Sequence, residues 1–152
     1  MQLYRDFRWG TLASFFVLDT RQYRTDQPCG DQSGPACDGM LDPNATPLGN
    51  MQEQWLLDGL GQSIARWNVI PQQIMMARVD RLPGDAEMLG MDIWSGYEVA
   101  RRRLMDFLAT RRPANPIVLT GDIHTNWVND LQVDYQDENA PIVATEFVGT
   151  SI

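Results

Sequence analysis

The sequence contains no lysine, a single histidine and two cysteines among its 152 residues. All 12 basic residues are therefore arginines, and they stand against 20 acidic residues for a formal net charge of −8. Because a phosphate backbone is bound by a basic face, this balance argues against nucleic acid as a partner. No apolar run reaches the roughly 18 residues that a membrane span needs. The opening MQLYRDFRWG lacks the charged, apolar and small-residue regions of a signal peptide.

Several common catalytic motifs are also missing. No serine sits in a G-x-S-x-G elbow, and neither a phosphate-binding G-x-x-x-x-G-K-[ST] loop nor a G-x-G-x-x-G segment follows a strand-like run. These absences exclude the corresponding serine-hydrolase and nucleotide-loop classes. With 43% hydrophobic residues, the chain still has enough apolar surface for the core of one ordinary domain.

Both cysteines lie in DQPCGDQSGPACDG, a segment too rich in Gly, Pro and Asp to form a regular element. A disulfide between Cys29 and Cys37 would close a ring of about nine residues and stabilise the fold by about 2.5 kcal/mol on the chain-entropy estimate. Two free thiols or a Cys/Asp metal loop are the alternatives, although no CxxC and no nearby histidine complete a zinc set. We expect the disulfide, which favours an oxidising compartment outside the cytosol.

Apolar runs of strand length alternate with stripes of helical spacing along the chain. The strand-like runs cover residues 11–19, 67–77, 117–122 and 141–152, and the helical stripes cover residues 51–66 and 97–108. Residues 20–50 read as a long loop insertion, residues 78–94 as a second loop, and residues 127–135 as either helix or strand. This order predicts a mostly parallel α/β sheet, in which ligands bind beyond the carboxyl ends of the strands.

Local signals refine these elements. Asn50 is expected to cap the first helix, with Glu53 completing a variant capping box. Pro71 should confine the paired part of its strand to the second half, because proline cannot donate to a ladder. The run Arg101, Arg102 and Arg103 is expected to lie mostly on a solvated helix face.

The chemistry of the chain centres on VLTGDIHTNW, which carries the only histidine. In an extended chain Asp122 and His124 point to the same side and can converge on one cation. An imidazole with a carboxylate suits Fe, Zn or Mn, but a catalytic metal centre needs at least three protein ligands, so others must come from elsewhere. Alternatively, Asp122 caps a helix or turn and His124 is a partly buried, hydrogen-bonded histidine.

Two arginines follow the end of the first strand-like run, in LDTRQYR. Arg21 and Arg24 are candidates for contacts to a phosphate group, because a guanidinium can bind phosphate oxygens with two parallel hydrogen bonds. The alternative is a surface ion pair with Asp19 or Asp26. Spacing alone favours neither the phosphate contact nor the metal site.

Four stretches taken together resemble the alkaline phosphatase D (PhoD-like) family. They are FFVLDTRQYRTDQPC, QEQWLLDGLGQSIARWNVIPQQIMMA, IVLTGDIHTNWVNDL and VATEFVGTSI. The resemblance implies a secreted or periplasmic bacterial metallophosphatase, related to calcineurin-like and purple acid phosphatases, that hydrolyses phosphate monoesters and diesters. It also implies a β-sandwich flanked by helices and a centre of Fe(III) with Ca(II). The family's G-D-x-H motif falls on Gly121, Asp122 and His124, which makes Asp122 and His124 catalytic metal ligands.

The chain departs from the family pattern in its upstream metal ligands. It contains no Gly-Asp-x-x-Tyr motif and no upstream ligand block, and Cys29 is not in the position of the family's metal cysteine. Residues 1–152 are therefore expected to form a partial domain, the later part of the catalytic domain. The function implied is a metal-dependent phosphoric ester hydrolase with phosphate esters as partners. The alternative is a non-catalytic remnant that acts only as a scaffold or self-associating piece.

Overall fold

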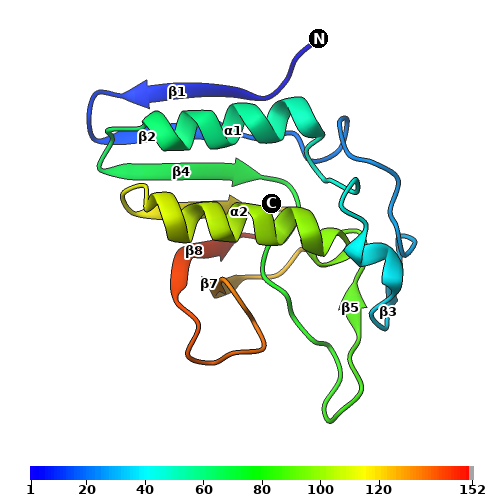
Figure 1. The fold of residues 1–152 in the computed structure, drawn as a ribbon. Helices are drawn as coiled ribbons and strands as arrows, with labels where there is room; N and C mark the ends of the chain where they lie inside the picture. The colour runs from blue at the N-terminus through cyan, green and yellow to red at the C-terminus, as the bar shows by residue number, and fades with distance from the viewer. Residues whose placement is uncertain (151–152) are drawn as a thin grey trace.

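A six-stranded mixed sheet forms the centre of the computed structural model, which describes residues 1–150 (Figure 1). The strands in spatial order are β1 (Arg5–Trp9), β2 (Ala13–Val17), β4 (Trp67–Gln72), β6 (Pro116–Thr120), β8 (Ile142–Val148) and β7 (Trp127–Gln132). The four central strands are parallel, and β1 and β7 pair antiparallel at the two edges. The prediction of a mostly parallel α/β sheet is thus confirmed.

Two helices, α1 (Asn50–Gln62) and α2 (Glu98–Arg111), lie on the same face of the sheet (Figure 1). Their apolar sides meet inward-facing strand residues, and the main core includes Leu56, Leu60, Ile70, Leu104 and Val118. Two short 3-10 helices, η1 (Asp38–Leu41) and η2 (Trp94–Tyr97), lie in the connecting segments. Among residues 1–150, no helix has the length and apolar character of a membrane span.

The first helix differs from the expected range and cap. It ends at Gln62 rather than residue 66, so that Ile64 is exposed and Trp67 begins β4. Gly49 rather than Asn50 is its N-cap, with φ 71, and a Cβ at this glycine would lie 2.8 Å from the carbonyl oxygen of Tyr23. The backbone therefore requires glycine here, and this tight approach decides where the helix begins.

The strand around Pro71 also differs from the prediction. We expected pairing in the second half of residues 67–77, whereas β4 occupies the first half and includes Pro71. The carbonyl oxygen of Pro71 accepts a hydrogen bond from Leu18 N, beyond the β2–β4 pairing, which ends at Phe15 and Val69. The proline nitrogen, which carries no hydrogen, faces this same side, where the regular pairing with β2 has already ended.

Three further segments settle what the sequence pattern left open or missed. The ambiguous segment 127–135 forms strand β7, and the apolar run 141–152 forms β8, with residues 151–152 outside the described residues. The edge strand β1 was not predicted, because its side chains are all exposed and give no buried pattern.

The face of the sheet opposite the helices is apolar and uncovered by any described residues. Large side chains exposed on it are Phe7, Trp9, Trp67, Leu119, Val128 and Phe147. Within residues 1–150, the only other sheet is the two-stranded pair β3 (Ser33–Gly34) and β5 (Leu89–Gly90), which does not cover this face (Figure 1). The observed fold is therefore a mixed sheet with helices on one face, and the implied β-sandwich is not formed by these residues.

The arginine run in α2 is not a uniformly solvated face. Arg101 is 1% exposed, and its guanidinium donates to the carbonyl oxygens of Met76 at 3.1 Å and Gln132 at 3.4 Å. Desolvation lowers the pKa of Arg101, although the charge of Glu98 opposes this shift.

Arg103 reaches across to α1 and binds the Glu53 carboxylate with two hydrogen bonds of 2.6 and 2.9 Å. Glu53 thus joins two helices, and the expectation of a capping box was wrong.

Replacing Arg101 tests this buried contact. The Arg101→Met variant should lower the free energy of unfolding by roughly 2–3 kcal/mol, because two buried carbonyl oxygens lose their donor. Arg111→Met, an exposed position on the same helix, is the matched control and should change stability by less than about 1 kcal/mol. Urea unfolding monitored by circular dichroism measures both variants, and equal effects would contradict burial of Arg101.

Candidate functional site

The loops that follow the parallel strands gather at one edge of the sheet. The segments after β2, β4 and β6 leave at the carboxyl ends of neighbouring strands, and the loops that contain β3 and β5 lie beyond these ends (Figure 1). This edge is where ligands bind in open α/β sheets. The polar residues of VLTGDIH are located here, as the sequence indicated.

Arg21 connects two of these loops. Its guanidinium donates to Asp92 Oδ2 at 2.7 Å and to Asp122 Oδ2 at 2.5 Å. Arg24 and Gln27 both donate to the other carboxylate oxygen of Asp92, at 2.7 and 2.8 Å. The ion pairs predicted with Asp19 or Asp26 do not form, and Asp92 and Asp122 are the partners instead.

Asp19 has a different role at the start of this loop. Its Oδ1 accepts hydrogen bonds from the backbone N–H groups of Arg21 and Gln22, both at 3.0 Å. A turn closed by an aspartate in this way fixes the backbone directly after the strand. Asp19 thus orients the segment that carries Arg21 and does not neutralise its charge.

The environment of Asp92 stabilises its charged form. Desolvation would raise the pKa of Asp92, but hydrogen bonds from Arg21 and Gln27 and the charges of Arg21 and Arg24 outweigh it and lower this pKa. Asp92 therefore remains ionised at neutral pH. The contact of Arg21 with Asp122 is the more exposed one, with 37% and 55% of the two side chains accessible. Such a surface pair contributes about 0–1 kcal/mol and exchanges partners at little cost.

Asp122 and His124 lie in a tight turn and not in an extended strand. Strand β6 ends at Thr120, and Ile123 N donates to Gly121 O at 2.9 Å across a three-residue turn. Asp122 has φ 70 and His124 has φ 59, both in the left-handed region that non-glycine residues rarely adopt. The alternation expected for an extended chain is thus wrong. Backbone strain of this kind costs about 1–3 kcal/mol and is found most often at functional sites.

The residues present do not by themselves fit a metal centre. Across residues 1–150, no group of three or more His, Cys, Asp or Glu side chains is placed to hold a metal ion. Asp122 is engaged with Arg21, and His124 is exposed. Two donors fall short of the three or more that catalytic metals require.

The buried carboxylate of Glu146 holds the strand end that precedes the turn at residues 121–124. Glu146 on β8 is 0% exposed and accepts four hydrogen bonds, from Met76 N at 2.7 Å, Ala77 N at 2.9 Å, Thr120 Oγ1 at 2.7 Å and Asn129 Nδ2 at 3.1 Å. Thr120 also accepts a hydrogen bond from Gln72, so three strands are joined at the point where the turn begins. Glu146 therefore fixes the position from which residues 121–124 depart.

Sequence reasoning missed Glu146 and Asp92. In VATEFV, Glu146 lies on the same buried face of the strand as Ala144 and Val148. A carboxylate at an inward position of an apolar strand needs hydrogen-bond partners. This signal was available in the sequence. Asp92 gave no comparable signal, because its position depends on how a loop of irregular structure folds back toward Arg21.

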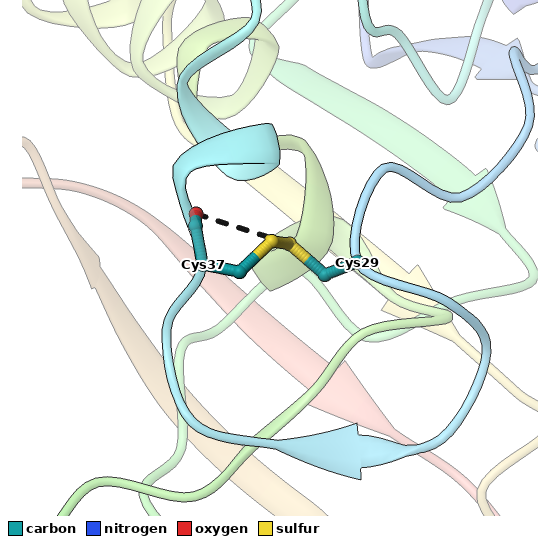
Figure 2. The surroundings of a disulfide bond; sticks show 2 residues. All are labelled: Cys29 and Cys37. Carbon is teal, nitrogen blue, oxygen red and sulfur yellow. Dashed lines mark hydrogen bonds between the residues drawn. A yellow bond between two sulfur atoms is a disulfide. The ribbon is translucent and has the colours of Figure 1, made fainter.

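A small apolar core holds the long loop of residues 20–50 to the second loop, and a disulfide closes a ring within the long loop. Cys29 and Cys37 are bonded, and Figure 2 shows the chain between them looping outward through β3. The carbonyl oxygen of Cys37 lies 3.8 Å from Cys29 Sγ, a contact without a hydrogen bond because a disulfide sulfur carries no hydrogen. Cys29 packs against Met40, Leu89 and Met91. These contacts order the segment that begins with Arg21 and Arg24.

The fold defines an α/β protein with polar residues at the carboxyl edge of its sheet, and comparisons with known proteins identify its family. The model of the PhoD-like phosphatase family matches residues 1–152, and the chain belongs to this family. It is 47% identical over 152 residues to alkaline phosphatase D of Bacillus subtilis (strain 168), and it spans 26% of that protein's length. A solved structure described as the structure of PhoD matches with a TM-score of 0.94 and 47% identity, over 99% of this chain and 29% of that one.

Removing the charge of Glu146 tests its supporting role. The Glu146→Gln variant should lose roughly 2–3 kcal/mol of stability, because an NH2 group, which cannot accept a hydrogen bond, replaces one of the two carboxylate oxygens. Glu138→Gln, at an exposed position, is the matched control and should change stability by less than about 0.5 kcal/mol. Chemical denaturation with both variants provides the measurement. A Glu146→Gln midpoint equal to that of the control would show that the four contacts do not hold the strand ends.

Proposed function

We propose that this chain is part of a metal-dependent phosphoric ester hydrolase of the alkaline phosphatase D type, acting on phosphate monoesters and diesters. The observation that carries the proposal is the family match over residues 1–152, combined with a G-D-x-H turn at the carboxyl edge of the sheet. The chain spans less than a third of the relatives it matches, so the activity proposed is that of a complete protein.

Asp122 and His124 are proposed as two ligands of the metal centre, with the remaining ligands supplied by residues beyond this chain. An imidazole and a carboxylate suit iron, and carboxylate oxygen also suits calcium, in agreement with the Fe(III) and Ca(II) implied by the resemblance. Bound metal ions neutralise phosphoryl oxygens and lower the pKa of coordinated water. The contact with Arg21 engages Oδ2 of Asp122, and the exposure of this ion pair makes an exchange of partners inexpensive.

Arg21 and Arg24 are proposed to contact the phosphoryl group. A guanidinium has five N–H donors, and each of these arginines uses only one or two in its contacts with Asp92 and Asp122. Arg21 gains free donors when Asp122 binds elsewhere, while Asp92 keeps it in place. The two arginines also offset the acidic net charge of the chain near an anionic substrate.

The proposal extends to the cellular location and the missing layer of the fold. A disulfide joining Cys29 and Cys37 agrees with a secreted or periplasmic protein, because such bonds persist in oxidising compartments. The uncovered apolar face is proposed to pack, in the complete protein, against a second sheet that would complete the β-sandwich.

Substitution of His124 in the complete protein tests the hydrolase proposal. His124→Ala should lower turnover of p-nitrophenyl phosphate and bis-p-nitrophenyl phosphate by at least about 100-fold and reduce the bound metal, because a direct ligand is lost. Gln136→Ala, an exposed position away from the turn, is the control and should retain both. Elemental analysis and steady-state kinetics are the measurements. Full metal content and turnover in His124→Ala would disprove the ligand assignment.

A second candidate function, a non-catalytic self-associating piece, is favoured by the uncovered sheet face. Val128, Leu119 and Phe147 are 71%, 41% and 43% exposed and lie side by side on three strands. An exposed apolar patch of this kind marks an interaction surface. We expect weak or no phosphatase activity for the isolated 152-residue chain under either candidate. Saturable, metal-dependent turnover by that chain would contradict the remnant.

Charged substitutions on the uncovered face test self-association of the isolated chain. We expect concentration-dependent association in sedimentation velocity, abolished in the double variant Leu119→Glu, Phe147→Glu because burying the two carboxylates would be costly. The double variant Leu41→Glu, Leu82→Glu, which alters exposed leucines outside the sheet, is the control and should associate like the parent. A parent chain that stays monomeric at every concentration would refute the prediction.

A further inference from the structure

A cavity of about 320 Å³ lies directly beside the G-D-x-H turn. Its apolar wall is formed by Met75, Val79, Ile93, Ile123 and Trp127. An apolar cavity of about 150 Å³ is enough to hold benzene, so this one has room for a substituted aromatic ring. Its size and lining are those of a pocket for a small ligand group.

The cavity and the charged cluster share two loops. Ile93 and Ile123 line the cavity, and the residues that directly precede them, Asp92 and Asp122, both bind Arg21. Neighbouring Cα atoms are about 3.8 Å apart, so the charged groups and the apolar wall are within the span of one small molecule. A phosphoryl group held by Arg21 would thus have its ester substituent close to the cavity.

The walls of the cavity are formed before any ligand binds. Ile93, Ile123 and Val79 pack against the main core, which limits their movement. The indole N–H of Trp127 donates to Thr125 Oγ1 at 2.6 Å, and this bond restricts rotation of the ring. Trp127 remains 40% exposed and has apolar area to bury against a ligand. A rigid wall reduces the entropy lost on binding.

We propose that this cavity binds the apolar ester group, above all an aryl group, of a phosphate ester whose phosphoryl oxygens contact Arg21. The substrates preferred by the complete protein are then esters of aromatic or other apolar alcohols. This inference rests on the proposed phosphoric ester hydrolase and adds the substrate class. Trp127 and Val79 determine the specificity, whereas Arg21 binds the charged group common to all such esters.

Binding of two phosphonates to the complete protein tests the proposal without requiring turnover. Phenylphosphonate and methylphosphonate carry the same anionic group, and only the former has a ring to place in the cavity. Calorimetric titration should give a dissociation constant for phenylphosphonate roughly ten- to a hundredfold lower. Trp127→Ala should reduce this ratio toward one, with methylphosphonate binding unchanged. Ile64→Ala, an exposed apolar position outside the sheet, is the control and should keep the ratio of the parent protein.

A second variant covers the case in which Trp127→Ala does not fold. Val79→Phe fills the cavity from another side and should also abolish the preference for phenylphosphonate while methylphosphonate still binds. Equal affinities of the parent protein for both phosphonates, or a preference that survives Val79→Phe, would overturn the proposal. Failure of the hydrolase proposal is a separate result, because it would appear as absent turnover of every phosphate ester while the phosphonate ratio is still measurable.

Discussion

The buried carboxylate of Glu146 is the contact on which the arrangement of the strand ends depends. A charge removed from water is tolerated only where several donors replace its hydration, and Glu146 has four, from β6, β7 and the turn after β4. Arg101 holds the same turn through a hydrogen bond to the carbonyl oxygen of Met76. The backbone at residues 76–77 is therefore fixed by one anion and one cation, and the wall of the neighbouring cavity begins there, at Met75.

The charged residues in the loops next to these strand ends can exchange hydrogen-bond partners more easily. Asp122 sits in a strained turn, with its carboxylate held by an exposed arginine, whereas the more protected Asp92 holds Arg21 and Arg24. This difference in exposure between Asp122 and Asp92 determines which contact would break when an ion binds at this edge. A ligand that draws Asp122 away from Arg21 breaks one weak pair and leaves Arg21 anchored by the stronger one. The strained backbone at Asp122 and His124 is held in place because Thr120, which precedes the turn, is fixed by its hydrogen bond to Glu146.

The elements that sequence predicted best were those with strong buried periodicity. Strands β2, β6 and β8 and helix α2 each show an apolar pattern that packing reinforces, so their existence followed from the sequence. The errors arose where distant contacts decide. Helix α1 begins after Gly49, where the backbone of Tyr23 approaches closely. Arg101 is buried where it donates hydrogen bonds to the carbonyl oxygens of Met76 and Gln132. The position of Asp122 and His124 after the end of a strand followed from the sequence, but their left-handed conformation did not. The contact of Arg21 with Asp92 depends on loop folding that no local pattern encodes.

The two faces of the sheet place different demands on the chain. The helix side carries a continuous apolar core, and the buried carboxylate of Glu146 has four hydrogen-bond donors there. The other side exposes aromatic and aliphatic residues on five of the six strands, including Trp67, Leu119 and Phe147. Apolar area of this extent is favourable only when removed from water, at about 25 cal/mol per Å². The edge that carries the candidate site lies at the rim of this face, because β4, β6 and β8 contribute both to the apolar face and to the strand ends. The second sheet proposed to pack on this face in the complete protein would therefore also border the edge that carries Arg21 and Asp122.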